Sequence, residues 1–250
     1  MVTSITIAYF SPTGGTKRAA QLLADRFDLP AAYLDLTRPE NREQRYDLTP
    51  DTLLIAACPV YLGQLPMVAR LFENLMGDRT PCAVMAAYGN REYENLPAQL
   101  GAKLERQGFV CLGGIACIIP HCYLEEMGKG RPDEEDMPAF SAFAQAIMQK
   151  LDNPPYSAAL LPGEAEPKRR QLRSFSKTWD EASCTYCGIC AAECPTEAID
   201  PQSMRVDPER CIVCVKCCSI CPTGAWQFDG TNMRTYLLPY LEHNPVEWFV

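Results

Sequence analysis

The sequence predicts an α/β fold followed by a small module that binds metal. In residues 1–152, apolar runs typical of strands alternate with amphipathic runs typical of helices. Such alternation indicates a parallel sheet covered by helices on both faces. Farther along the chain, nine of the 14 cysteines crowd into residues 184–221. In a 250-residue chain this density favours metal ligands over disulfides.

The sheet is predicted to have five strands joined by four helices. Strands are expected within residues 5–10, 31–36, 51–60, 81–89 and 109–120, and helices within 16–27, 67–76, 96–108 and 132–151. In the first helix Ala19, Leu22, Leu23 and Phe27 recur at helical spacing. The last helix is expected to begin at Pro132, which places four acidic residues at its positive end.

The chain divides into four segments. Residues 1–152 form the α/β domain, and residues 153–180 form a linker that is rich in proline and ends in the basic run "KRRQLRSFSK". Residues 181–229 carry the cysteines. The tail, residues 230–250, is too apolar for a free end, so we expect it to pack on one of the domains.

Composition limits the classes of function. The net charge of −8 argues against a nucleic-acid partner, because phosphate binding needs a basic surface. No apolar run is long enough to span a membrane, and the start of the chain does not resemble a signal peptide, so we expect a cytoplasmic protein. The two histidines are too few for a histidine-rich metal site.

The cysteine segment repeats one spacing, C-x2-C-x2-C-x3-C-P, in "CTYCGICAAECP" and "CIVCVKCCSICP". Soft thiolates suit iron, and a 4Fe–4S cube needs one thiolate for each iron. A zinc site is the alternative, but it would use only four of the cysteines. The repeat resembles bacterial two-cluster ferredoxins, in which the last cysteine of each run serves the other cluster. This resemblance implies one cluster on Cys184, Cys187, Cys190 and Cys221, and a second on Cys211, Cys214, Cys217 and Cys194, with Cys218 left unused.

The loop "SPTGGT" after the first strand is suited to a phosphate group. It lacks the spacing of a Walker A loop and of the dinucleotide fingerprint. What remains is a turn rich in hydroxyl groups that leads into the start of a helix, where free N–H groups and the helix dipole attract a small dianion. The candidate residues are Ser11, Thr13, Gly14, Gly15 and Thr16.

This loop is similar to the FMN-phosphate loop of flavodoxins, although many relatives have Asn where Gly15 stands. The resemblance implies the strand order 2-1-3-4-5 and a flavin at the carboxyl ends of the strands. The loops "CPVYLGQLP" and "AAYGNREYENLP" end the third and fourth strands there. Their candidate flavin contacts are Pro59, Val60, Tyr61, Tyr88, Gly89, Asn90 and Arg91, and His121 after the fifth strand is a candidate catalytic residue.

Taken together, the segments resemble the flavodoxin–ferredoxin fusion proteins of anaerobic bacteria, also called ferrodoxins. That resemblance implies electron transfer between two 4Fe–4S clusters and FMN, to or from a redox partner protein, either a ferredoxin-type donor or an acceptor enzyme. Two alternatives remain open. One is a flavin-dependent reductase that delivers hydride to a small acceptor such as a quinone or a free flavin. The other is an FMN-free scaffold that presents a ferredoxin.

Overall fold

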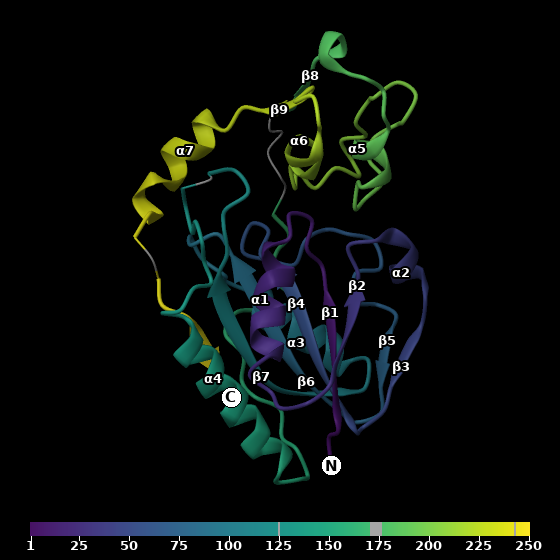
Figure 1. Ribbon diagram of the computed structural model, residues 1–250. Helices are drawn as coiled ribbons and strands as arrows, with labels where there is room; N and C mark the ends of the chain where they lie inside the picture. Colours follow the sequence, from purple (N-terminus) through teal and green to yellow (C-terminus); the bar gives the residue numbers. More distant parts are fainter. Residues whose placement is uncertain (125, 171–176, 243) are drawn as a thin grey trace.

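The computed structural model of the protein describes residues 1–124, 126–170, 177–242 and 244–250. Its largest unit is a six-stranded sheet in the order β10-β7-β6-β4-β1-β2 (Figure 1). The strands are β1 (Ser4–Tyr9), β2 (Ala31–Asp35), β4 (Thr52–Pro59), β6 (Thr80–Tyr88), β7 (Phe109–Ile118) and β10 (Glu247–Phe249). All neighbours pair in parallel except β10, which is antiparallel to β7.

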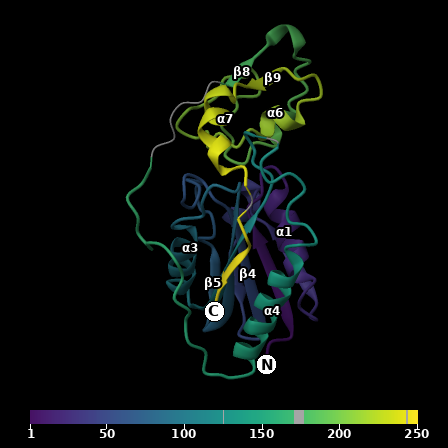
Figure 2. The ribbon, with the colours of Figure 1, turned by 90° about the vertical axis from the view of Figure 1, so that its left-hand side faces the viewer.

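The five parallel strands have the flavodoxin-like order 2-1-3-4-5, so the predicted fold class is confirmed. The sixth strand comes from the C-terminal tail, where Glu247 pairs with Ala116 and Phe249 with Gly114. An uncovered edge strand presents unpaired N–H and C=O groups. The tail satisfies those groups on β7, and it thereby brings the end of the chain back to the first domain (Figure 2).

Helices cover both faces of the sheet. Helices α1 (Gly15–Ala24) and α4 (Met137–Leu151) pack on one face, and α3 (Leu96–Glu105) packs on the other (Figure 2). The strands alternate accordingly: Ile5 and Ile7 of β1 face α1, whereas Ala8 belongs to the opposite cluster. Each strand is therefore apolar on both sides, as a doubly covered parallel strand must be.

The helix predicted for residues 67–76 is absent, and that prediction was wrong. The segment forms turns, with Arg70 and Phe72 at positive φ, and ends in the short strand β5 (Leu75–Gly77). The side chain of Gln107 donates hydrogen bonds to the carbonyls of Phe72, Glu73 and Leu75. This one amide group, shared among three carbonyls, partners backbone groups that a helix would have bonded internally, and the turns bury the adjacent side chains Leu71 and Phe72 together.

The last helix of the first domain begins later than predicted, at Met137 rather than at Pro132. Asp136 is buried and pairs with Arg131, and it also accepts a hydrogen bond from the amide of Asp133 at 2.9 Å. The acidic run thus closes a turn before the helix instead of forming its first turn. The sequence pattern alone does not distinguish a turn before the helix from the first turn of the helix, because acidic residues fit both.

Smaller elements complete the first domain and the tail. They are α2 (Pro39–Glu43), β3 (Tyr46–Leu48), which pairs with β5, α7 (Thr231–Leu237) and η2 (Leu238–Tyr240). None of the helices in the described ranges has the length and apolar character that a membrane span requires.

The linker runs along the α3 side of the first domain. The amide of Ala159 donates to the carbonyl of Cys111, and Leu161 packs into the cluster that includes α3. An added Cβ on Gly101 would lie 2.5 Å from Leu161 Cδ1, so the linker side chain packs closely on the backbone of α3 there. Part of the predicted basic run, residues 171–176, lies outside the described residues.

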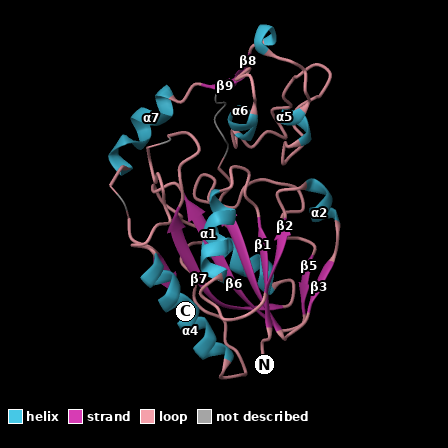
Figure 3. Cartoon of the chain, viewed as in Figure 1, coloured by secondary structure: helices cyan, strands magenta, loops and turns pink. Residues whose placement is uncertain are grey.

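The cysteine-rich domain is small and consists mostly of loops (Figure 3). Its regular elements are β8 (Lys177–Trp179), η1 (Glu181–Ser183), α5 (Ile189–Ala192), α6 (Lys216–Ile220) and β9 (Trp226–Phe228). Strands β8 and β9 form an antiparallel pair, so residues 177–179, which were predicted to belong to the linker (153–180), pair with the cysteine-rich domain.

Candidate functional site

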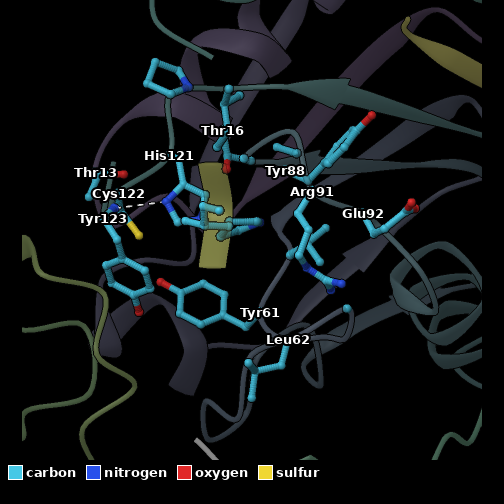
Figure 4. A pocket seen from close by; sticks show the side chains of 18 of the residues that line it. Thr13, Thr16, Tyr61, Leu62, Tyr88, Arg91, Glu92, His121, Cys122 and Tyr123 are labelled. Carbon is cyan, nitrogen blue, oxygen red and sulfur yellow. Dashed lines mark hydrogen bonds between the residues drawn. The ribbon is translucent and has the colours of Figure 1, made fainter. Parts of the chain in front are cut away.

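A pocket of about 350 Å³ opens at the carboxyl ends of the parallel strands. The loops after β1, β4, β6 and β7 form most of its wall (Figure 4), and we call it the sheet-edge pocket. Its lining includes the predicted residues Ser11, Thr13, Thr16, Pro59, Val60, Tyr61, Tyr88, Gly89, Arg91 and His121. A parallel sheet of this order brings these loops together at its switch point.

The loop after β1 is shaped to receive an anion. Gly14 has φ +89°, with no atom within 4 Å of an added Cβ, and it precedes the first residue of α1. The Ser11 hydroxyl accepts a hydrogen bond of 3.0 Å from the amide of Lys17. Thr16 Oγ1, by contrast, is buried and lacks a hydrogen-bond partner among the described residues. An unpartnered hydroxyl at a helix N-terminus is the arrangement that a bound phosphate would complete, so the residues fit the group.

A tight hairpin holds Tyr61 in the wall of the pocket. Tyr61 and Gln64 exchange two backbone hydrogen bonds of 2.9 Å, and Leu62 and Gly63 between them have positive φ. Burial raises the pKa of the Tyr61 phenol well above its usual value. The phenol therefore remains protonated and presents a hydrogen-bond donor and an aromatic face to the pocket.

His121 lies against Gly89, where an added Cβ would stand 2.2 Å from the imidazole Cδ2. The amide of Tyr123 donates to His121 Nδ1 at 3.1 Å, so the proton of the neutral ring belongs on Nε2 (Figure 4). Burial, together with the nearby charge of Arg91, lowers the pKa of His121 to about 4. At neutral pH the ring is an uncharged donor.

Two of the predicted flavin contacts lie at the end of β6 and in the loop that follows it. Arg91 lines the pocket and forms an ion pair with Glu94, which also pairs with Arg170. Tyr88 is buried, and its ring packs edge-on against Tyr93 at 5.6 Å.

Asn90, which was expected to contact the flavin, is fully buried and binds the tail instead. Its amide nitrogen donates to the carbonyls of Tyr240 and Glu242, and its oxygen accepts from the amide of Asn244. The side chain of Asn90 therefore anchors the tail, and it is not part of the pocket lining.

Several lining residues were not predicted. Helix α7 contributes to the pocket wall, the linker adds Arg170, and the loop after β7 adds Cys122 and Tyr123. The α7 residues are Met233, Tyr236 and Leu237. The apolar character of the tail was a signal that it packs somewhere, but the sequence did not indicate that it packs beside this pocket.

The cysteines surround two hollows in the small domain. We define the inner hollow by the four predicted ligands of the second cluster and the outer hollow by those of the first. Around the inner hollow lie Cys194, Cys211, Cys214 and Cys217, with Lys177 and Cys190. Around the outer hollow lie Cys184, Cys187, Cys190 and Cys221, with Met204 and Trp226. Each hollow thus gathers cysteines from both halves of the repeat, and its donor set suits iron.

The sulfur atoms surround these hollows and do not converge on one point. Among the described residues, no three Cys, His, Asp or Glu side chains are placed to share a single metal ion. A 4Fe–4S cube requires one thiolate at each of four separate irons. Cys218 lies next to Cys217 on α6 and is not part of the lining of either hollow.

The inner hollow adjoins the first domain. Ile212 and Cys214 are buried in the same apolar cluster as the α3 face of the sheet. The hydroxyl of Tyr123 donates to the carbonyl of Val213 at 2.6 Å. A guanidinium nitrogen of Arg42, a buried residue, donates to the carbonyl of Pro195 at 2.7 Å. The loops that carry Cys194 and Cys214 therefore meet the first domain directly.

Comparisons with known proteins found one matching family model and several similar solved structures. Residues 177–200 match the family model for a 4Fe-4S binding domain. A comparison with curated proteins found no match. Among solved structures, the chain is similar to a flavodoxin from Streptococcus pneumonia TIGR4, with 17% identity and a TM-score of 0.42, over 59% of this chain and 99% of that one. It is also similar to flavodoxin 2 from Bacillus cereus, with 20% identity and a TM-score of 0.40, over 59% and 99% of the two chains.

The strand order of the sheet, rather than these scores, defines the fold of the first domain. The chain combines a flavodoxin-like domain with a segment that matches the 4Fe-4S binding domain, and this combination supports a role in electron transfer.

Proposed function

We propose that this protein transfers low-potential electrons between two 4Fe–4S clusters and an FMN bound in the sheet-edge pocket. The clusters would be held by the four predicted ligands around each hollow. FMN would be anchored by the loop of Ser11, Thr13 and Thr16, with its ring among Tyr61, His121 and Arg91. Bound iron–sulfur clusters supply one-electron chemistry, and a flavin accepts one or two electrons.

The observation that carries this proposal is the contact between the inner hollow and the pocket. Tyr123 lines the pocket and also binds the carbonyl of Val213, between Cys211 and Cys214. Two redox sites in one chain exchange electrons without a diffusional encounter, which raises their effective concentration.

The outer hollow would face the redox partner. Cys187 is exposed, and the neighbouring Tyr186 and Ile189 expose 48% and 42% of their surface. Large exposed side chains beside a cluster ligand are a fitting contact for a partner protein, because aromatic and apolar groups are favoured at the centre of interfaces. The pocket itself is bordered by α7 and Arg170, so a protein partner has less access to it.

Anaerobic purification with analysis of iron, sulfide and flavin tests the composition. The proposal expects about eight irons and one FMN per chain. About four irons would contradict the second cluster, and failure to take up added FMN would favour the scaffold alternative. Rapid reduction by a ferredoxin-type donor, with electrons appearing on both cofactor types, would support the transfer role.

A reductase is the second candidate, and the pocket provides the observation that favours it. Neutral His121 and charged Arg91 are hydrogen-bond donors that a small acceptor could use. Steady-state oxidation of NAD(P)H with a quinone or free flavin as acceptor would favour this function. Absence of that turnover, together with fast reduction by the protein donor, would favour electron transfer.

A further inference from the structure

Lys177 is placed against the sulfur atoms of the inner hollow. Its ammonium nitrogen lies 3.1 Å from Cys211 Sγ and 3.9 Å from Cys217 Sγ. The same nitrogen lies 5.8 Å from the ring centroid of Trp226. Lys177 is half-buried on β8, so its charge is only partly screened by solvent.

Among the described residues, no lysine or arginine lines the outer hollow. Within the described ranges, its sulfur atoms have hydrogen-bond contacts with the amide of Tyr186, the sulfur of Met204 and the hydroxyl of Thr223. Its buried wall includes the indole of Trp226. The indole is a neutral donor. The two hollows, which share one cysteine spacing, therefore differ in charge.

The second lysine beside the inner hollow forms an ion pair with a carboxylate. Lys216 also lines that hollow, but its ammonium donates to Glu193 at 2.7 Å. For Lys177, no carboxylate is found within ion-pair distance in the described part of the chain. The ammonium group of Lys177 therefore interacts with the sulfur atoms of Cys211 and Cys217.

We propose that Lys177 raises the reduction potential of the cluster in the inner hollow above that of the cluster in the outer hollow. The inference rests on the proposed two-cluster function. A reduced cluster carries one more negative charge than an oxidised one, so a nearby cation and a charge-assisted hydrogen bond to its thiolates stabilise the reduced form.

This difference gives the relay a direction. With clusters bound in both hollows, an electron that a low-potential one-electron donor gives to the outer cluster would pass to the inner one, so that the outer cluster is reoxidised and the inner one reduced. The residues around the inner hollow would then hold the electron next to the sheet-edge pocket. Lys177 is thus a residue that tunes a potential, and it is not a catalytic residue.

The test is a redox titration of the anaerobically purified full chain, followed by the EPR signals of its reduced clusters. Lys177→Met removes the charge and the hydrogen bonds, and Lys177→Arg keeps the charge. Arg205→Met is the matched control, because it removes one exposed positive charge from the same domain without touching a sulfur. Iron and sulfide content establish that each variant carries both clusters.

In Lys177→Met we expect the midpoint reduction potential of one cluster to fall by about 59 mV. For a one-electron couple this shift changes the distribution of the electron between the two clusters about tenfold. The second midpoint stays in place, Lys177→Arg restores most of the difference, and Arg205→Met changes neither. A Cys187→Ser background, which alters the outer cluster, assigns the affected signal: the Lys177→Met change must fall on the other one.

Two fully loaded clusters whose midpoints do not move in Lys177→Met would overturn the inference and leave the proposed function intact. A change on the outer cluster, or an equal change on both, would overturn it as well. A preparation with only about four irons would overturn both the inference and the two-cluster function.

Discussion

The hydroxyl of Tyr123 donates a hydrogen bond of 2.6 Å to the main-chain carbonyl of Val213. Tyr123 belongs to the loop after β7, and Val213 lies between two cysteines of the inner hollow. The ring of Tyr123 also stacks on Phe228 of β9, with 4.8 Å between centroids. One side chain of the first domain thus holds two elements of the second, at the edge of the sheet-edge pocket.

Tyr123→Phe tests how much this hydrogen bond contributes to holding the two domains together. The variant keeps the ring but loses the hydrogen bond, which should weaken the contact by about 1 kcal/mol. The population of molecules in which the two domains have separated should then rise about fivefold. Hydrogen–deuterium exchange of the amides in residues 211–217 measures that population, and we expect faster exchange there.

The matched control is Tyr186→Phe. Its hydroxyl donates to Glu181 at 2.9 Å within the small domain, at an exposed position. It should leave exchange at 211–217 unchanged. Equal exchange in Tyr123→Phe and the wild type would mean that the remaining contacts hold the domains together without this hydrogen bond, namely the packing of Ile212 and Cys214, the ring stacking on Phe228 and the bond from Arg42 to Pro195.

Thr16→Val tests the phosphate site. Thr16 Oγ1 is buried without a partner among the described residues, so its removal costs the free protein little and could even stabilise it. FMN would lose a hydrogen bond to a charged group, worth about 1.5–3 kcal/mol, or roughly 10- to 150-fold in affinity. Quenching of flavin fluorescence during titration measures the dissociation constant.

Riboflavin separates the phosphate from the ring in this experiment. It lacks the phosphate, so its affinity should be the same for Thr16→Val and the wild type. An equal loss for FMN and riboflavin would show that Thr16 shapes the pocket generally, and it would contradict a role in phosphate binding.

His121 makes stability depend on pH. Burial and the charge of Arg91 lower its pKa to about 4 in the folded state, against about 6.5 in the unfolded chain. Between these values the unfolded state binds more protons, so stability falls as the pH drops from 6.5 to 4 and is unaffected by this group above 6.5. The loss should reach about 2 kcal/mol, allowing for partial solvent screening.

His121→Gln should remove this part of the pH dependence. The comparison is the difference between the urea-unfolding free energies of variant and wild type at pH 7 and pH 4.5, because carboxylates that titrate in the same range cancel in the difference. If the difference in unfolding free energy between variant and wild type is the same at both pH values, then folding does not lower the pKa of His121.

The sequence predicted best the parts of the protein where local pattern and burial agree. Strands β4, β6 and β7 are apolar on both faces, and their runs mark a doubly covered sheet without ambiguity. The pattern also predicted that Ser11, Thr13 and Thr16 lie at the ligand edge of the sheet, where all three line the pocket, and phosphate binding by this loop stays a prediction.

Tertiary contacts decide the parts that sequence did not predict. Residues 67–76 have helical periodicity, yet Gln107, far along the chain, binds their carbonyls in a set of turns. Asn90 was expected to contact the flavin because it follows a strand at the ligand edge, and its amide instead meets a tail some 150 residues later. Neither partner can be inferred from spacing, since no local pattern connects segments so distant.

Asn90 offers the last prediction, because it joins the pocket loop to the tail. Its φ of +62° is left-handed, so Asn90→Gly removes the side chain without the backbone strain that alanine would add. The three hydrogen bonds it loses, to Tyr240, Glu242 and Asn244, should cost about 3 kcal/mol in the free energy of unfolding by urea.

Limited proteolysis shows where that stability is lost. Cleavage next to Tyr240, Glu242 and Asn244 should become much faster in Asn90→Gly, because backbone groups of these residues bond to the Asn90 side chain. Asn153→Gly is the control, since the side chain of Asn153 is exposed and donates to the nearby carbonyl of Gln149, its one side-chain hydrogen bond among the described residues. If the tail of Asn90→Gly resists protease as well as the wild type does, then the pairing of β10 with β7 suffices to hold it, and α7 keeps its place beside the pocket without the Asn90 anchor.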